Sequence, residues 1–600
     1  MAVQTTGVKD RIQLLRGEMK KRGIAMYIVP TADFHESEYV GDYFKARSYL
    51  TGFTGSAGTA VITLAQAGLW TDGRYFIQAK NQLEGSGITL YRMGEEGVPT
   101  VEEYVRQNLE EGGCLGFDGR LVNAKAGKAY EEITAAKQGR IAAGEDLVGV
   151  VWKERPPFPK HPAFLLGEEY AGESTESKLG KVREKMKEKQ ADVHILTSLY
   201  DIAWLFNIRG GDIAHVPVVM SFAAITMDEC FWFVHREVLD KDLLNYCADK
   251  EITLKDYEAV YAYAERIPRE KKVLLDKSIV NYRIYCSLKA EVIQEHNPTE
   301  LMKAVKNEVE ISNIRSAHVK DGVAFTKFMY WLKSRIGKEE ITEISASDYL
   351  EARRREQDLF ADLSFDTISA YGANAAMMHY AATPETNATL EPEGFLLVDS
   401  GGHYLDGSTD ITRTISLGSL TREQKEHFTT ICRCNLNLAA AKFLHGCRGT
   451  NLDILAREPL WNQGLDYRCG TGHGIGYFLN VHEGPNAFRW RRPADPDGDC
   501  VLEEGMITTD EPGIYLEGKY GIRTENEILC KKAEKNEYGQ FMEFEIITYA
   551  PIDLDAILPE EMTVKERGLL NQYHKMVYEK LSPFLDAEER DWLRRYTREI

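Results

Sequence analysis

Long apolar stretches are absent from this sequence of 600 residues. No window approaches the roughly twenty uninterrupted apolar residues that a membrane-spanning helix needs. The N-terminus, MAVQTTGVKD, has no apolar core either and runs into a charged helical pattern. We therefore expect neither a transmembrane span nor a signal peptide.

An excess of positive charge is also missing, because the net charge is −20 and the isoelectric point lies near 5.3. Phosphate backbones and anionic lipids are bound by basic surfaces, so we expect neither nucleic acid nor membrane as a partner. The 10 cysteines are scattered singly apart from Cys432 and Cys434, and their spacing matches no zinc site. This usage predicts reduced thiols and a cytoplasmic protein.

What the sequence does contain is an ordered set of potential metal ligands in its C-terminal half. Four carboxylates and one imidazole form an oxygen-rich set that suits Mn²⁺, Mg²⁺ or Co²⁺ better than the sulfur- and nitrogen-rich sites preferred by zinc. Bridging carboxylates can hold two ions roughly 3.5–4 Å apart, the arrangement that activates a water. The candidates are Asp399 in LLVDSGG, Asp410 in STDITRT, His473 in GTGHGIG, Glu511 in TTDEPG and Glu525 in GIRTENE.

Each candidate, taken alone, also has an ordinary explanation. Asp399 could open a turn after the apolar run Phe395–Val398, and Asp410 could lie on the solvated face of an alternating strand. The glycines around His473 either let the backbone approach something closely or form a flexible surface loop. Glu511 could enter the turn that Pro512 begins.

The same holds at the end of the set, where Arg523, Glu525 and Glu527 could form a surface ladder of ion pairs on one strand face. Jointly, such coincidences in one order over about one domain length are improbable. We therefore interpret the set as the site of a metallohydrolase.

Breaks in pattern divide the chain. An amphipathic helix over 8–22 precedes a strand over 24–29, and helix–strand alternation continues to about Trp152. Residues 155–162 are rich in proline and predict an extended linker, after which a helix over 174–189 and a strand over 193–196 open a second unit. We see no internal repeat and no low-complexity tract.

Further along, Asn297 and Pro298 predict the start of one long helix that includes residues 306–310. The catalytic part begins about there and ends near Ile552, and helices follow through Leu569 and Trp592. The predicted domains are residues 1–157, 163–296, 297–552 and 553–600.

The five motifs match those of the pita-bread metallopeptidases of family M24B, which include methionine aminopeptidase, prolidase and aminopeptidase P. The sequence most resembles aminopeptidase P, the Xaa-Pro aminopeptidases, over nearly its whole length. Further segments carry this resemblance: VPTADFHESEY (29–39), TGFTGSAG (51–58), LWTDGRY (69–75), DIAWLFNIRG (201–210) and NVHEGP (480–485).

The resemblance implies a mixed α/β (α+β) fold. Two creatinase-like N-terminal α/β domains would precede a pita-bread catalytic domain and a short helical C-terminal extension. It also implies a metallo-aminopeptidase that hydrolyses the first bond of peptides with proline in second position, using a hydroxide held by two divalent ions. An X-Pro bond lacks the N–H group that ordinary peptidases recognise. We expect Mn²⁺ as the metal, with Co²⁺ or Zn²⁺ as alternatives, and a homodimer.

Residue roles follow from the same resemblance. Asp399, Asp410, His473, Glu511 and Glu525 would hold the metals. Glu511 would also accept the proton of the water. Glu527 competes with its neighbour Glu525 for the role of the last ligand. Glu525 is assigned because the family ligand follows an arginine by two positions, and that arginine, Arg523, would orient Asp399.

Substrate contacts are implied for His379, His482, Tyr515 and Cys469. The two histidines would bind the scissile carbonyl oxygen and assist protonation of the leaving nitrogen, although either could instead be a structural histidine. Cys469 stands where many family members have a third histidine. A thiol is a poor hydrogen-bond donor, so we expect altered peptide-length preference and an unchanged reaction.

Two other functions compete with this one. Prolidase, which cleaves Xaa-Pro dipeptides, shares the five ligands. The N-terminal segments and the C-terminal extension of this chain, however, resemble aminopeptidase P more than prolidase. A catalytically inactive pita-bread module that binds peptides or histones would have lost ligands, whereas all five are present here.

Overall fold

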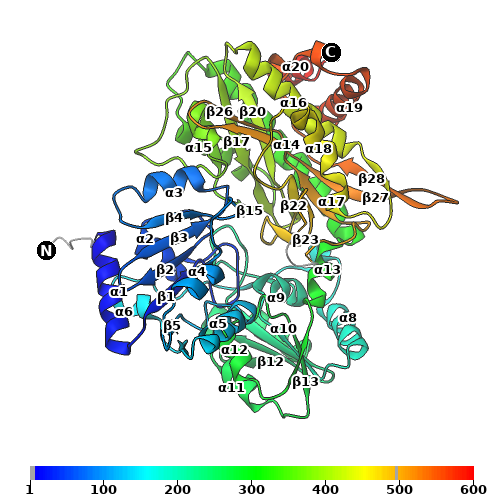
Figure 1. Cartoon of the computed structure of the whole chain (residues 1–600). Helices are drawn as coiled ribbons and strands as arrows, with labels where there is room; N and C mark the ends of the chain where they lie inside the picture. Colours follow the sequence, from blue (N-terminus) through cyan, green and yellow to red (C-terminus); the bar gives the residue numbers. More distant parts are fainter. Residues whose placement is uncertain (1–6, 493–497) are drawn as a thin grey trace. The chain divides into compact units, whose positions relative to one another are not determined.

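Residues 7–492 and 498–600 are described by the computed structural model, in which the chain forms two units (Figure 1). Unit 1 comprises Met1–Leu166 and Glu173–Thr299, and unit 2 comprises Gly167–Gly172 and Glu300–Ile600. Both units combine helices with sheets, which confirms the predicted mixed fold. The finer division into four domains stays a prediction.

Unit 1 contains two six-stranded sheets. The first has the order β4-β3-β2-β1-β5-β6 and the second the order β12-β11-β10-β8-β13-β14. Their strands are β1 (Met26–Pro30), β2 (Thr59–Thr63), β3 (Ala67–Thr71), β4 (Thr89–Arg92), β5 (Cys114–Gly116), β6 (Arg140–Ala142), β8 (Val193–Leu196), β10 (Ser221–Thr226), β11 (Cys230–Val234), β12 (Ile252–Lys255), β13 (Lys272–Leu275) and β14 (Glu291–Gln294). The longer helices are α1 (Val8–Arg22), α4 (Val101–Asn108), α5 (Ala124–Ala136), α8 (Thr175–Glu188), α9 (Leu199–Phe206), α10 (Lys241–Asp249) and α11 (Ala259–Arg266).

The two sheets share one topology, although the sequence shows no repeat. In each, the strand that follows the first long helix, β1 or β8, pairs antiparallel with the next sheet strand and parallel with a later one, β5 or β13. These strands are nearly continuous apolar runs because sheets of this kind are covered on both faces. The predicted helix-then-strand openings are therefore confirmed, and the proline-rich segment 155–162 has no helix or strand.

The predicted long helix from Asn297 is wrong. The chain forms α13 (Pro298–Ala304) and then a separate α14 (Glu308–Arg335). Asn307 caps α14, because its side-chain oxygen accepts from the backbone N–H groups of Val309 and Glu310, each at 3.0 Å. The N–H of Lys306 instead donates to the carbonyl of Gly505, so a cap interrupts the pattern that resembled one helix.

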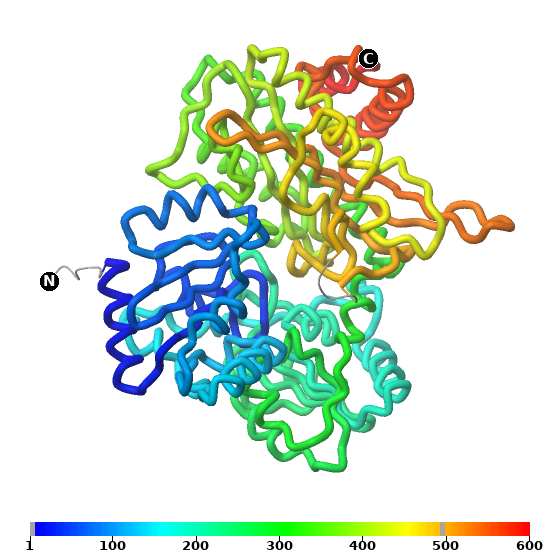
Figure 2. The backbone as a smooth tube through the Cα atoms, viewed as in Figure 1, coloured from blue at the N-terminus to red at the C-terminus, as the bar shows by residue number. Residues whose placement is uncertain are grey.

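Unit 2 is built from a six-stranded sheet, β21-β28-β27-β24-β22-β23, two three-stranded sheets, β16-β17-β20 and β15-β18-β19, and a two-stranded sheet, β25-β26. The strands are β15 (Phe360–Leu363), β16 (Ile368–Tyr371), β17 (Phe395–Ser400), β18 (Gly402–Tyr404), β19 (Gly407–Ser408), β20 (Ile411–Ser416), β21 (Lys442–Leu444), β22 (Gly472–Gly474), β23 (Glu483–Phe488), β24 (Ile507–Asp510), β25 (Gly513–Leu516), β26 (Tyr520–Arg523), β27 (Asn526–Asn536) and β28 (Gly539–Ile546). The hairpin of β27 and β28, orange in Figure 2, extends beyond the other strands of this unit.

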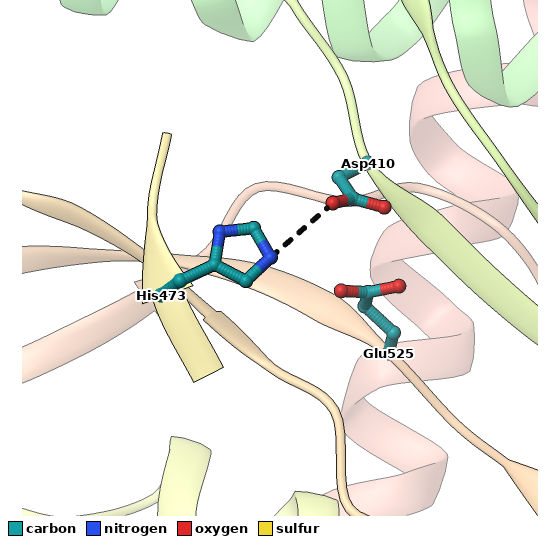
Figure 3. Close-up of side chains that lie close together, drawn as sticks. All are labelled: Asp410, His473 and Glu525. Carbon is teal, nitrogen blue, oxygen red and sulfur yellow. Dashed lines mark ion pairs between the residues drawn. The ribbon is translucent and has the colours of Figure 1, made fainter. Parts of the chain in front are cut away.

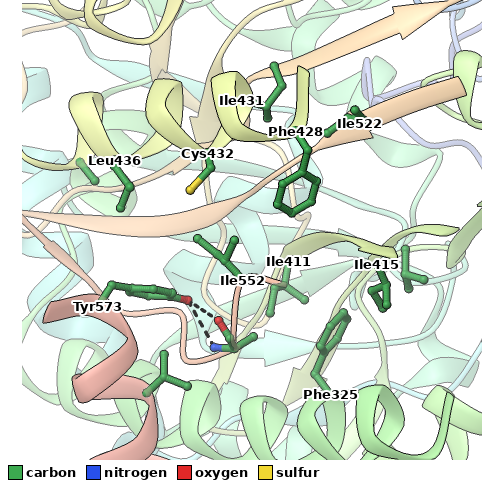
Figure 4. Close-up of a cluster of buried hydrophobic side chains, with 14 of the residues drawn as sticks. Phe325, Ile411, Ile415, Phe428, Ile431, Cys432, Leu436, Ile522, Ile552 and Tyr573 are labelled. Atoms are coloured by element: carbon green, nitrogen blue, oxygen red, sulfur yellow. Dashed lines mark hydrogen bonds between the residues drawn. The ribbon is translucent and has the colours of Figure 1, made fainter. Parts of the chain in front are cut away.

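Helices pack around these strands and bury one large core. The helices are α14, α15 (Glu343–Arg355), α16 (Arg422–Ala439), α18 (Ile454–Trp461), α19 (Val564–Leu581) and α20 (Ala587–Tyr596). Figure 4 shows Phe428 and Ile431 of α16, Ile411 and Ile415 of β20 and Phe325 of α14 in this core. Each such side chain contributes about 1.5–3 kcal/mol when fully buried, so the strands that it covers are held firmly.

The C-terminal residues form the predicted helices. α19 packs on α16 and α14, and α20 packs on α14. Leu570 and Leu593 are fully buried, at 0% exposure, so these helices belong to the core of unit 2. Among the described residues, no helix is both long and apolar enough to cross a membrane.

Candidate metal centre

The five candidate ligands lie at the ends or edges of different strands in unit 2. Asp399 is in β17, Asp410 directly precedes β20, and His473 is the central residue of β22. Glu511 lies between β24 and β25, and Glu525 lies between β26 and β27. Strand pairing brings these segments together, since β17 pairs with β20 while β24 pairs with both β22 and β27.

Three of these side chains form a compact cluster, shown in Figure 3. One ligand atom from each of Asp410, His473 and Glu525 lies within 4.8 Å of the others. The Nε2 atom of His473 is 3.5 Å from Oδ2 of Asp410 and 3.5 Å from Oε1 of Glu511. His473 Nδ1 faces the carbonyl of Gly474 at 2.9 Å, which leaves Nε2 turned toward the carboxylates.

Asp399 is held at the same cluster by Arg523. The guanidinium donates from Nη2 to Oδ2 of Asp399 at 2.5 Å, from Nε to Oγ1 of Thr412 at 3.0 Å and from Nη1 to the hydroxyl of Tyr515 at 2.7 Å. Arg523 is 3% exposed, so these contacts fix its plane. Arg523 and Asp399 thus form a buried ion pair, and the orienting role of Arg523 stays a prediction.

Several carboxylate oxygens in the cluster are buried without a hydrogen-bond partner. They are Oδ1 of Asp399, Oδ1 of Asp410 and Oε1 of Glu525. A buried, unpaired carboxylate oxygen is costly, and such atoms in one cluster are accounted for by cations. The donor set is rich in carboxylate oxygen, so these residues fit hard divalent ions.

The electrostatics of the metal-free site point the same way. Burial, followed by the charges of Glu525, Asp399 and Glu511, raises the pKa of Asp410 well above its usual range. Burial and the charge of Glu511 do the same to the pKa of Glu525. Burial raises the pKa of Glu511 to about 7, and the charge of Asp399 adds to this. A divalent ion would reverse these shifts, because it stabilises the ionised carboxylates.

The glycines around His473 serve close approach of two backbones. A Cβ on Gly472 would lie 1.8 Å from the carbonyl oxygen of Thr509, and one on Gly474 would lie 2.3 Å from that of Glu483. Larger residues would therefore separate β22 from its neighbours. A flexible surface loop is the wrong alternative here, since His473 lies in a paired strand.

The other surface explanations are also wrong. Asp410 and Thr412 are 4% and 0% exposed, so the alternating segment has no solvated face. Arg523, Glu525 and Glu527 are exposed by 3% or less, and they come from the end of β26, the connection and β27. A surface ladder is excluded by this burial.

Glu527 faces a different neighbourhood from Glu525. Its Oε1 accepts from the backbone N–H of Asp410 at 2.8 Å and lies 3.1 Å from Nε2 of His318 on α14. Glu525 instead accepts from Thr412 Oγ1 at 2.7 Å and belongs to the cluster. This difference supports Glu525 over Glu527 as the ligand.

The expected substrate residues are placed as follows. The ring of His482 lies 4.2 Å from that of His473, edge to face, and the hydroxyl of Tyr515 contacts Arg523. The half-buried Cys469 lies near Tyr515. His379 is half-buried and follows the short helix η3 (Gly372–Ala376), which packs on β25 and β26. Contact with a substrate stays a prediction for all four.

Two threonines in contact with the candidate ligands were not predicted. Thr412 Oγ1 donates to Glu525, and Thr509 Oγ1 contacts Oε1 of Glu511 at 3.4 Å. Thr412 could have been found, since the alternating pattern puts it on the same strand face as Asp410. Thr509 gives no such signal in the sequence.

The carboxylate-rich cluster suits a metal-dependent enzyme, and the family models that match this chain define the class as metallopeptidase. "Creatinase/Prolidase N-terminal domain" matches residues 11–143 and 154–310. "Metallopeptidase family M24" matches residues 312–532, and "C-terminal region of peptidase_M24" matches residues 540–600.

Relatives similar over the whole chain narrow the class. Aminopeptidase P1 of Arabidopsis thaliana is 37% identical over 625 residues, which cover 96% of each chain. A protein named probable Xaa-Pro aminopeptidase P of Aspergillus flavus is 37% identical over 100% of this chain and 94% of its own. This chain thus belongs to the Xaa-Pro aminopeptidase family of metallopeptidases.

Solved structures agree. The X-prolyl aminopeptidase of Caenorhabditis elegans, described as a cytosolic enzyme with a di-nuclear active site, is 33% identical with a TM-score of 0.94 over 99% of this chain and 100% of its own. The Xaa-Pro dipeptidase of Bacillus anthracis is 25% identical with a TM-score of 0.50, and it covers 64% of this chain and 99% of its own.

Proposed function

We propose that this chain is a two-metal aminopeptidase that removes the first residue from peptides with proline in second position. Membership of the Xaa-Pro aminopeptidase family supports the substrate class. The observation that carries the chemistry is the buried cluster of Asp410, His473 and Glu525 with its unpaired carboxylate oxygens.

Two divalent ions would be held by Asp399, Asp410, His473, Glu511 and Glu525. When bound, they would supply an activated water and polarise the scissile carbonyl. The oxygen-rich donor set favours Mn²⁺, with Co²⁺ or Zn²⁺ as alternatives.

Glu511 is the residue that we propose to accept the proton of the attacking water. It is half-buried at the cluster, and its Oε1 lies 3.5 Å from His473. Its partner Thr509 and the neighbouring strand β24 fix its position, so the proton has a defined acceptor. Arg523 would hold Asp399 in its orientation through a charge-assisted hydrogen bond, a task that a planar fork of donors suits.

His482 and His379 are proposed to donate hydrogen bonds to the scissile carbonyl oxygen as it gains negative charge. One of them would also pass a proton to the leaving nitrogen of proline, which has no N–H of its own in the substrate. The position of the His482 ring against His473 supports its part. Tyr515 and Cys469 would line the substrate side of the cluster.

Prolidase is the second candidate. The relatives that match over the whole chain are named aminopeptidase P1 and probable Xaa-Pro aminopeptidase P, which favours the aminopeptidase. An inactive binding module is disfavoured because the full ligand set is present.

The test is product analysis by mass spectrometry after Mn²⁺ is added to metal-stripped enzyme. We expect Arg-Pro-Pro to release arginine far faster than Gly-Pro is split. Cleavage of the dipeptide with refusal of the tripeptide would make the chain a prolidase. Binding of either peptide without any product would support the inactive module.

We also propose a cytoplasmic homodimer. The Caenorhabditis elegans enzyme is described as cytosolic, and the single, scattered cysteines of this sequence suit reduced thiols. Sedimentation analysis of the metal-loaded protein would test the dimer, and a single monomeric species at micromolar concentration would refute it.

A further inference from the structure

Tyr573 of helix α19, in the C-terminal extension, reaches into the polar interior of unit 2. It is 3% exposed, and Figure 4 shows it in the same cluster of buried side chains as Ile552. Its hydroxyl donates to the carbonyl of Ala550 at 2.7 Å and accepts from Nη2 of Arg413 at 2.6 Å. The phenol thus joins a C-terminal helix to a residue of β20, the strand that follows Asp410.

Arg413 connects this phenol to the backbone of a candidate ligand. It is 1% exposed, and its Nη1 donates to the carbonyls of Glu525 at 2.6 Å and Thr412 at 2.8 Å. Its Nη2 also donates to Oδ1 of Asn526 at 2.7 Å. A planar guanidinium that binds both β20 and the start of β27 fixes their separation, and with it the distance between Asp410 and Glu525.

A second arm continues toward Glu511. Asn526 Nδ2 donates to Oδ1 of Asn435 at 2.9 Å, and Asn435 Nδ2 donates to the carbonyl of Asp510 at 2.6 Å. Both asparagines are 0% exposed. Asp510 directly precedes Glu511, so the chain of hydrogen bonds from Tyr573 ends next to a third candidate ligand.

This network is fully paired, which makes it rigid. Every side-chain nitrogen and oxygen of Tyr573, Arg413, Asn526 and Asn435 takes part in a hydrogen bond given above or, for Nε of Arg413, with the carbonyl of Pro551 at 3.2 Å. Without the Tyr573 hydroxyl, Arg413 Nη2 keeps Oδ1 of Asn526 and the carbonyl of Ala550, at 2.9 Å, as acceptors, but the guanidinium loses its link to helix α19.

We propose that Tyr573 is a positioning residue for the metal centre, acting through Arg413 and Asn526 on the segments that carry Asp410, Glu525 and Glu511. The inference rests on the proposed function, because it assumes that these residues hold metal. The C-terminal extension then helps to position the metal ligands, in addition to covering the core of the catalytic unit.

The test is Tyr573→Phe, which removes one hydroxyl and keeps the ring. Tyr578→Phe is the matched control, because Tyr578 lies on the same helix and its hydroxyl contacts Arg594, at 2.9 Å from Nη2. Mn²⁺ affinity is measured by calorimetry. The values of kcat and KM are measured on an Xaa-Pro tripeptide, and thermal unfolding is measured on the metal-free proteins.

In Tyr573→Phe we expect Mn²⁺ affinity and kcat to fall about tenfold with KM unchanged, and we expect no change in the control. Wild-type Mn²⁺ affinity and kcat in a Tyr573→Phe protein that is merely less stable would overturn the proposal. If that variant does not fold, Asn435→Ala removes the hydrogen bonds that join Asn526 to Asp510. The same loss of Mn²⁺ affinity and kcat would then support the proposal, and wild-type values would overturn it. Failure of the wild type itself to bind Mn²⁺ or cleave the tripeptide would instead refute the proposed function.

Discussion

Replacing Arg523 by lysine should separate the geometry of this cation from its charge. The guanidinium makes three hydrogen bonds, to Asp399, Thr412 and Tyr515. A lysine ammonium can keep the ion pair with Asp399 but cannot span the other two partners. Two lost hydrogen bonds from a charged donor amount to about 3–6 kcal/mol of unfolding free energy in the metal-free protein.

Metal binding should widen this difference. If Asp399 loses its orientation, Mn²⁺ affinity falls by about 10–100-fold. At saturating Mn²⁺ the variant then gains about 1.4–2.7 kcal/mol less stability from the ion than the wild type does. Turnover on an Xaa-Pro tripeptide should fall by a similar factor.

The assay is urea unfolding of wild type and Arg523→Lys with and without Mn²⁺, with metal titration beside it. Arg315→Lys is the control, because Arg315 also binds a carboxylate with two donors, Glu545 at 2.9 and 2.8 Å, but is 37% exposed. A surface pair of this kind contributes under about 1 kcal/mol and should not depend on Mn²⁺. Wild-type Mn²⁺ affinity in Arg523→Lys would refute the assigned orienting role.

Three further outcomes are expected. Chelation should abolish activity, and Mn²⁺ or Co²⁺ should restore it better than Zn²⁺. Glu511→Ala should lower kcat by several orders of magnitude, and near-normal turnover in this variant would contradict the two-metal site. Cys469→Ser should leave kcat within about tenfold of the wild-type value, and a thousandfold loss of kcat in this variant would show a chemical role for the thiol. Cys469→His should mainly change the KM for a pentapeptide relative to that for a tripeptide. Burial and the charge of Arg413 lower the pKa of His574 from 6.5 to about 3. The folded protein therefore keeps this imidazole neutral, and its contribution to the free energy of unfolding is complete above pH 6.5. That contribution is lost as the pH falls from 6.5 toward 3, because the unfolded chain then binds a proton that the folded chain does not. Urea unfolding should therefore show a shallower loss of stability between pH 7 and 4 in His574→Gln than in wild type, and equal slopes would contradict this assignment.

Local patterns predicted much of the fold. Helix α1 and strands β1 and β8 follow directly from apolar periodicity and strand-like runs. The break between α13 and α14 was missed although Asn307, followed three positions later by Glu310, carries the sequence signature of the capping box that the structure forms. The shared topology of the two sheets in unit 1 was also out of reach, since strand order depends on pairing between residues far apart in the chain.

The candidate site was predictable where a residue's role depends on its type and order. Asp410, His473 and Glu525 were named from motifs, and strand pairing brings them within 4.8 Å. Residues such as Asn435 and Tyr573 carry no comparable signal, because asparagine and tyrosine have many uses. Their part emerges only from hydrogen bonds that join helices α16 and α19 to β20 and β27.

Two buried polar clusters in unit 2 differ in one informative respect. The side-chain donors and acceptors of Arg413, Tyr573, Asn526 and Asn435 are all paired, as expected of a network that holds strands in place. Around Asp410 the cluster keeps unpaired oxygens on Asp399, Asp410 and Glu525, although burial makes each of them costly. Protein groups could have paired these atoms, as Thr412 does for the other oxygen of Glu525. Their incomplete pairing therefore indicates that the partner comes from outside the chain, and a cluster dominated by negative charge selects a cation.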